Sequence, residues 1–180
     1  MKRAFTMIEL IFVIVVIGIL AATIIPRMQN NPTQEAAIDL ISKLRYTQHL
    51  ALVDDKYDSS NPNWFKDRWR IVFSGETNSS YSIQDSNSSY AKDPLTRTKE
   101  IKNQKLRGVD SITFSGGCDK QIINFDYLGR PLIGDLTAPY DGNHLLKTPC
   151  TITLHGNEEN ACIIIEPESG YIKACDYNES

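Results

Sequence analysis

The chain has 180 residues, of which 41% are hydrophobic and 23% charged, and its formal net charge is −3 at pH 7. One long apolar stretch at the start leaves room for a single domain of ordinary size, which excludes two packed domains. Because acidic and basic residues are nearly balanced, the composition gives no signal for binding to nucleic acid or to an anionic membrane surface.

Residues 5–25 form an apolar run that predicts a transmembrane helix. Its 21 residues would make a helix about 30 Å long, which matches the hydrocarbon core of a bilayer. Lys2 and Arg3 precede the run, and short basic flanks stay in the cytoplasm, so the rest of the chain is predicted to lie outside it. The predicted localisation is the inner membrane, with a single pass and a periplasmic C-terminal domain.

A secretory signal peptide and a plain signal anchor are simpler interpretations of this run. The candidate cleavage site at 20–23 continues into two isoleucines and a proline, which makes it a poor one. Neither interpretation explains Glu9, because an ionised group costs about 2.5–3.5 kcal/mol at mid-membrane. A cut before Phe5 would create a free amine four positions from Glu9, able to pair with the carboxylate of a neighbouring subunit. Glu9 is therefore predicted to direct assembly into a filament.

The sequence FTMIEL at 5–10 resembles the type III signal of type IV pilins and pseudopilins. In that family prepilin peptidase cuts before an aromatic residue and methylates the new N-terminus. The resemblance implies a leader at 1–4, cleavage between Ala4 and Phe5, and N-methylation of Phe5. Ala4 stands where the family usually has glycine, so we expect slower cutting. Gly18 and Pro26 fall where pilin helices often carry a glycine and a proline, which implies helix flexibility there.

Residues 26–54 predict an amphipathic continuation of the helix. Asn31 can cap a helix, Pro32 suits its first position and Gln34 fits a capping box, so a second helical segment is predicted to begin here. Down to about Val53, one face of this segment is apolar, which predicts packing on a sheet. The apolar residues at helical spacing are Ala37, Leu40, Ile41, Leu44 and Ala51.

Residues 55–180 predict a β-rich globular domain. Alternating apolar residues from Trp69 to Phe73 indicate a strand with one buried face. Further strands are predicted at 81–84, 112–114, 122–125, 151–154, 162–165 and 171–174. The predicted fold class is α+β and pilin-like: a long N-terminal helix, with a transmembrane half and an amphipathic half, packed on an antiparallel β-sheet domain.

The four cysteines all lie in the last third of the chain, without a CxxC pair or metal-ligand spacing. In an oxidising compartment two disulfides are expected, with three possible connectivities, and four reduced, buried thiols are the alternative. A turn at 167–170 would join the last two predicted strands into a hairpin that brings Cys162 near Cys175. We therefore expect Cys118–Cys150 and Cys162–Cys175.

No pattern of catalytic chemistry is present in the sequence. The three histidines are scattered, and the hydrolase, metalloprotease, P-loop and dinucleotide motifs are absent, so the chain is predicted to be no enzyme and to need no cofactor. Asp135, Asp141 and Asn143 lack the dense spacing of a calcium loop, and no metal is assigned. Gly129 and Arg130 could contact a phosphate, but a β-turn is the favoured interpretation.

A basic run, interrupted only by Glu100, is the one local segment that could meet a phosphate backbone. It has no aromatic residue for base stacking, and the final 25 residues are acidic, so contact with nucleic acid is disfavoured. The candidate DNA contacts are Arg97, Lys99, Lys102, Lys105 and Arg107.

Trp64 and Trp69 before a strand, FDYLGRP at 125–131 and ESGYI at 168–172 also resemble the minor pseudopilin H of type II secretion and its FimT-like relatives. The resemblance implies a structural subunit of a type II secretion-like or type IV pilus-like machine, assembled into a periplasmic filament that drives protein export. Implied partners are other pilins or pseudopilins through the N-terminal helix, prepilin peptidase and an inner-membrane assembly platform. The alternative is a minor pilin of a DNA-uptake system that contacts DNA through the basic run.

Overall fold

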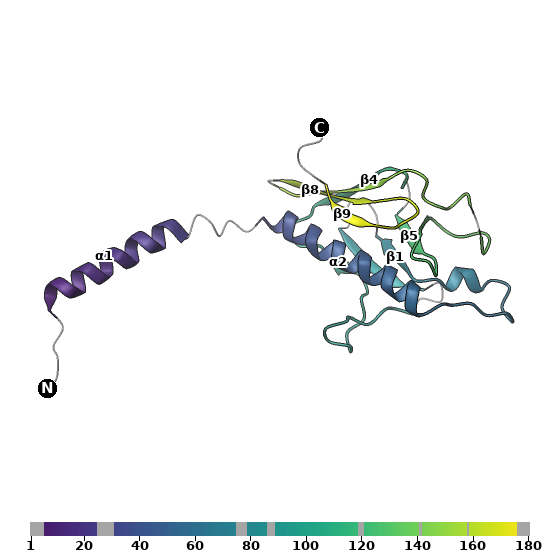
Figure 1. Cartoon of the computed structure of the whole chain (residues 1–180), viewed down its shortest axis with the longest axis horizontal. Helices are drawn as coiled ribbons and strands as arrows, with labels where there is room; N and C mark the ends of the chain where they lie inside the picture. The colour runs from purple at the N-terminus through teal and green to yellow at the C-terminus, as the bar shows by residue number, and fades with distance from the viewer. Residues whose placement is uncertain are drawn as a thin grey trace. The chain divides into compact units, whose positions relative to one another are not determined.

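The structure is a computed structural model that describes residues 6–24, 31–74, 79–85, 89–118, 121–140, 142–157 and 159–175. Within 21–24 it describes the backbone alone. The chain divides into two units, Met1–Asn31 and Pro32–Ser180, and each is described by itself (Figure 1).

The first unit contains helix α1, Met7–Ile24. Apart from Glu9 and Thr23, its residues are apolar or small, so no polar face stands opposite an apolar one. Every side chain from Thr6 to Leu20 is exposed. A helix with this pattern presents apolar surface in all directions.

The predicted fold class is wrong, because the residues that the structure describes contain no long N-terminal helix with a transmembrane half and an amphipathic half. Helix α1 ends at Ile24, and a separate helix, α2, spans Pro32–Val53. Proline has no N–H to donate to the carbonyl four residues earlier, and its ring clashes with that carbonyl, so an unbroken helix is strongly disfavoured through Pro32. Proline suits the first position of a new helix, which is its place in α2.

The predicted transmembrane segment at 5–25 is also wrong. Across the described ranges, no helix combines the length and the apolarity needed to cross a membrane. Helix α1 has 18 residues, whereas a bilayer's hydrocarbon core calls for about 20. This finding also corrects the predicted single-pass, inner-membrane localisation.

Helix α2 buries one stripe of side chains in the second unit. Ala37, Leu40, Leu44 and Thr47 are at most 1% exposed, whereas Ile38 on another face is 62% exposed. The stripe has the predicted spacing, and α2 begins and ends where the cap signals and the apolar pattern predict. Burial of this stripe against the sheets therefore determines which face of α2 points into the core.

Two antiparallel sheets complete the second unit, and α2 contacts strands of both (Figure 1). The first sheet has the strand order β3-β2-β1-β5-β6 and the second has the order β4-β7-β8-β9. The first comprises β1 (Arg70–Phe73), β2 (Ser80–Gln84), β3 (Gln104–Lys105), β5 (Ile122–Phe125) and β6 (Pro131–Ile133). The second comprises β4 (Ser111–Gly116), β7 (Cys150–His155), β8 (Asn160–Ile165) and β9 (Ile172–Ala174).

Each strand predicted from alternation is present, with ends that differ by at most two residues. The sequence does not predict the short strands β3 and β6, nor the 3-10 helix η2, Trp64–Asp67. The main core lies between α2 and the sheets and includes the fully buried Leu40, Leu44, Ile71 and Phe125. A second, smaller cluster surrounds η2 and consists of Trp64, Phe65, Leu132 and Leu136.

Candidate functional site

Glu9 lies in the first turn of α1, where it has a structural role as well as a predicted assembly role. The Glu9 N–H donates to Thr6 Oγ1 at 3.4 Å, and the Leu10 N–H donates to Thr6 O at 3.2 Å. Thr6 is therefore the N-cap, and Glu9 occupies the third helical position of a Thr-x-x-Glu capping-box pattern. A carboxylate at this end also interacts favourably with the helix dipole. The pattern is visible in the sequence at 6–9, but the assembly interpretation of Glu9 does not use it.

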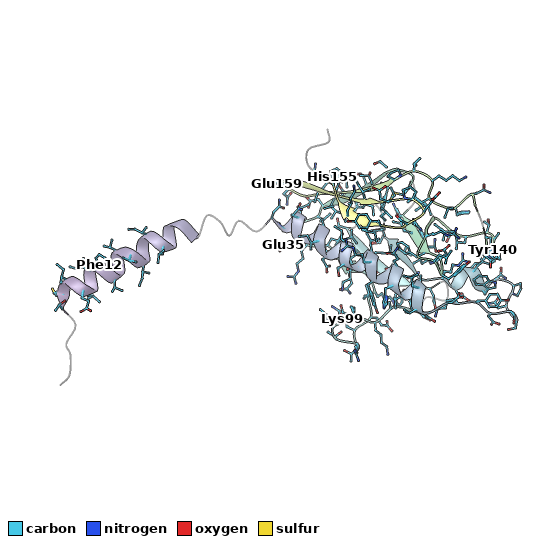
Figure 2. All side chains as sticks on the ribbon, in the orientation of Figure 1. Phe12, Glu35, Lys99, Tyr140, His155 and Glu159 are labelled. Atoms are coloured by element: carbon cyan, nitrogen blue, oxygen red, sulfur yellow. A yellow bond between two sulfur atoms is a disulfide. The ribbon has the colours of Figure 1, made fainter. Side chains whose placement is uncertain are left out.

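The rest of α1 is an exposed apolar surface. Its large apolar side chains from Met7 to Leu20 are between 39% and 85% exposed, and Figure 2 shows Phe12 projecting from the helix. Within this described part of α1, Glu9 is the single ionisable side chain. Exposed apolar surface of this extent marks an interaction site, since water solvates it poorly.

The remaining residues predicted for processing and flexibility are only partly described. Ala4, Phe5 and Pro26 lie outside the described residues. Gly18 lies within α1, which continues through it, and a Cβ added there would meet no atom within 4 Å. Packing inside this chain therefore does not require a glycine at 18, and its flexibility stays a prediction.

Two disulfides fasten the second sheet, and they join the pairs expected from the sequence. Cys118–Cys150 links the segment after β4 to the first residue of β7, and both cysteines are fully buried. Cys162–Cys175 closes the hairpin of β8 and β9, where the Cys175 N–H donates to Cys162 O at 3.0 Å. Disulfides persist in oxidising compartments, so the pair is consistent with a location of that kind.

Two of the basic residues predicted to contact DNA, Arg97 and Lys99, lie in an exposed loop, where Figure 2 labels Lys99. The loop is held by Asp93, whose carboxylate accepts the backbone N–H groups of Leu95 and Thr96 and pairs with Lys43 of α2 at 3.2 Å. Backbone hydrogen bonds to Thr96 and Leu95 lower the pKa of Asp93, against a small effect of burial, and Lys43 lowers it further. This arrangement orders the loop without building an anion site.

The other three basic residues have different surroundings. Lys102 Nζ lies 4.7 Å from the centre of the Tyr90 ring. Lys105 and Arg107 line a cavity of about 310 Å³ whose wall also carries the acidic Glu35 and Asp39 of α2. The predicted basic run is therefore divided between a loop, an aromatic contact and a mixed-charge cavity.

The Gly129-Arg130 segment forms the turn between β5 and β6. Asp126 Oδ1 accepts the N–H groups of Leu128 and Arg130, and Asp126 Oδ2 accepts Arg130 Nε at 2.8 Å. Gly129 has φ +78°, a value that favours glycine. The favoured β-turn interpretation is confirmed, and the arginine is paired within its own turn.

Two of the three histidines, His144 and His155, make separate local contacts. His155 Nε2 lies 2.9 Å from Thr113 Oγ1, and His144 Nδ1 lies 2.7 Å from Ile133 O. In the part of the chain that the structure describes, no group of three or more His, Cys, Asp or Glu side chains is placed to hold a metal ion.

Arg68 is a candidate that sequence reasoning missed. It is only 5% exposed, and its guanidinium lies over the Trp64 ring, 4.9 Å from the ring centre. The signal in the sequence is an arginine between two tryptophans, Trp64 and Trp69, which stack well on guanidinium groups.

No known family, curated protein or solved structure matches the chain.

Proposed function

We propose that the chain is a structural subunit of a pilus-like or pseudopilus-like filament, in a machine of the type II secretion or type IV pilus kind that drives protein export. In this role it performs no catalysis. Its partners are other subunits of the filament, bound through α1, together with a prepilin peptidase and an assembly platform.

One observation carries the proposal: α1 is apolar on all sides, exposed along its described length, and has a single carboxylate in its first turn. The apolar surface favours burial, since each Å² removed from water contributes about 25 cal/mol. Packing against α1 of other copies would provide that burial along the whole helix. A helix evolved for packing inside its own domain would carry a polar face, as α2 does.

The carboxylate gives this packing a register. Removal of residues 1–4 would leave a free amine on Phe5, four positions before Glu9 and one before the N-cap Thr6. Among packed helices an unpaired carboxylate would be desolvated at high cost, and the amine of a neighbour would neutralise it. The amine and the carboxylate meet at one relative displacement of the two helices. Their pairing therefore also determines how neighbouring subunits stack.

The second unit suits a rigid body carried on such a filament. Its β8–β9 and β4–β7 strand pairs are each closed by a disulfide, and α2 packs on both sheets. The DNA-uptake alternative has less support, because the basic residues are divided among separate surroundings, two of them beside Glu35 and Asp39.

Substitution of Glu9 tests the proposal in cells that make the filament. Glu9→Gln keeps the capping box, which accepts either residue, and removes only the charge. Loss of one partner of a buried ion pair costs about 3–5 kcal/mol, so we expect the chain recovered in sheared filaments to fall about a hundredfold or more.

Glu35→Gln is the matched control, since Glu35 is the acidic residue in the first turn of α2 and is exposed. It should leave recovery unchanged. Intact mass should show a chain that begins at a methylated Phe5. Equal recovery of the Glu9 and Glu35 variants, or a chain that retains Met1, would contradict the proposal.

A further inference from the structure

Arg68 carries a buried charge whose hydrogen-bonding capacity is unused. Among the described residues, its guanidinium makes no hydrogen bond and no ion pair within 4.0 Å, although the residue is only 5% exposed. Stacking over Trp64 satisfies one face of the planar group. The N–H donors on its edge hydrogen-bond to no described residue, and none of its nitrogens belongs to the fully buried atoms that lack a partner, so these donors are open to the cavity that Arg68 lines.

Asp126 does not pair with these donors. Asp126 is 3% exposed and attracts Arg68, but both of its oxygens accept hydrogen bonds from the β5–β6 turn, including the one from Arg130 Nε. Burial lowers the pKa of Arg68, and the charges of Asp126 and Asp55 oppose that effect. The guanidinium therefore has no carboxylate of a described residue as a hydrogen-bond partner, and its donors are available to a ligand in the cavity.

Arg68 lines a cavity of about 220 Å³. Arg130 and Asp126 complete its polar side, and Leu132, Pro139 and Tyr140 supply an apolar wall. Tyr140 is 74% exposed and stands at one end of the second unit (Figure 2). The cavity thus joins a buried guanidinium to the surface through an aromatic rim.

The charges and the wall select a class of ligand. Among the described residues of the lining, two arginines and one aspartate give a net charge of +1, which a monoanion balances and a phosphate dianion exceeds. A guanidinium fork matches the two oxygens of a carboxylate. The apolar wall favours a carboxylate on a short hydrocarbon stem.

We propose that this cavity is a carboxylate-binding site, with Arg68 as the anchor, for a glutamate or aspartate side chain or the C-terminal carboxylate of a protein partner. The site lies in the second unit and uses no residue of α1. It goes beyond the filament role, and either proposal can fail without the other.

Calorimetric titration of the full-length chain tests the site with four probes. These are an N-acetylated dipeptide Gly-Leu with a free C-terminus, an amidated and acetylated Gly-Glu-Gly, its Gly-Gln-Gly counterpart, and inorganic phosphate. We expect at least one carboxylate peptide to bind at least tenfold more tightly than the glutamine peptide and phosphate. The tighter of the two carboxylates identifies the source. Equal binding of the glutamine peptide or phosphate, or no binding by either carboxylate, overturns the proposal.

Variants tie the binding to the cavity. Arg68→Lys keeps the charge but not the fork, and should weaken the carboxylate peptide at least tenfold, whereas the loop variant Arg97→Lys should not change it. Tyr140→Ala alters only the exposed rim and should weaken binding several-fold with an unchanged unfolding midpoint. If Arg68→Lys fails to fold, the affinity of Tyr140→Ala alone tests whether the peptide binds in this cavity. Unchanged affinity in Tyr140→Ala and in any folded Arg68→Lys overturns the assignment.

Discussion

Helices α1 and α2 have similar lengths, 18 and 22 residues, but they relate to water in opposite ways. In α2 a stripe that includes Leu40 and Leu44 is fully buried and the remaining faces are polar or exposed. In α1 the apolar residues occupy every face and are exposed along its described length. The second unit therefore covers one apolar face of α2, whereas the described side chains of α1 are exposed on every face.

The difference teaches that the two helices serve different levels of organisation. Contacts within the second unit determine where α2 lies, so its sequence needs only one apolar face. Helix α1 has no single apolar face, and under the proposed function its one carboxylate adds specificity to an otherwise uniform surface. Three predictions can break or sharpen this comparison.

Removal of the disulfides should have the largest effect on the free energy of unfolding. The comparison requires bonds within the second unit to stabilise it. Cysteines 32 residues apart close a longer loop than those 13 apart, so replacing Cys118–Cys150 by alanines should lower the free energy of unfolding by about 4 kcal/mol and replacing Cys162–Cys175 by about 3 kcal/mol. Urea titration followed by tryptophan fluorescence measures both, since Trp64 and Trp69 lie in this unit. A negligible loss in either variant would contradict the expectation.

Truncation of apolar residues compares the helices directly. Leu44→Ala, at a fully buried site in α2, should destabilise the second unit by about 2–5 kcal/mol. Ile38→Ala on the exposed face of α2 and Ile14→Ala in α1, which are 62% and 58% exposed, should each change it by less than about 0.5 kcal/mol. The same fluorescence titration applies. A loss for Ile14→Ala as large as that for Leu44→Ala would remove the distinction between the helices.

A smaller, pH-dependent effect concerns the contact between α2 and β2. Burial raises the pKa of Tyr81, and the charges of Asp39 and Asp93 together with a hydrogen bond to Asp39 raise it further. Because the folded state favours the neutral phenol, its contribution to stability is complete below the unfolded pKa of about 10 and is lost as the pH rises beyond it. Tyr81→Phe should therefore flatten the alkaline decline of the unfolding free energy, whereas Tyr171→Phe, at a site 58% exposed, should not. An identical decline in the wild type and Tyr81→Phe would refute this.

Local patterns predict much of the second unit. Alternation of apolar and polar residues reveals strands such as β7, in which every second residue is buried. Asn31 and Pro32 mark the start of α2. Strand β3 has two polar residues, and β6 begins with a proline, so neither has an alternation long enough to detect. The predicted long helix fails because it treats residues 26–54 as a continuation of the first helix, although Asn31 and Pro32 mark the start of a separate one.

The candidate sites also divide into those that a local sequence pattern predicts and those that it does not. Glu9 stands out because a carboxylate interrupts an apolar run, and the hairpin pairing of Cys162 with Cys175 follows from a turn between adjacent strands. Arg68 does not stand out, since arginines are mostly exposed and its burial depends on how η2, the β5–β6 turn and Tyr140 meet in three dimensions. The basic run fails as a single patch because neighbours in sequence turn to different surroundings.

Zero-length cross-linking of sheared filaments tests the central claim most directly, that α1 helices of different copies pack with the amine of one beside Glu9 of another. Filaments would be built from a mixture of light and isotopically heavy chains and treated with a carbodiimide, with the Lys43–Asp93 ion pair at 3.2 Å as the internal control within one chain. The account predicts a linked peptide that joins Phe5 of one isotope to Glu9 of the other. Recovery of the Lys43–Asp93 product without any mixed-isotope link at Glu9 would contradict it.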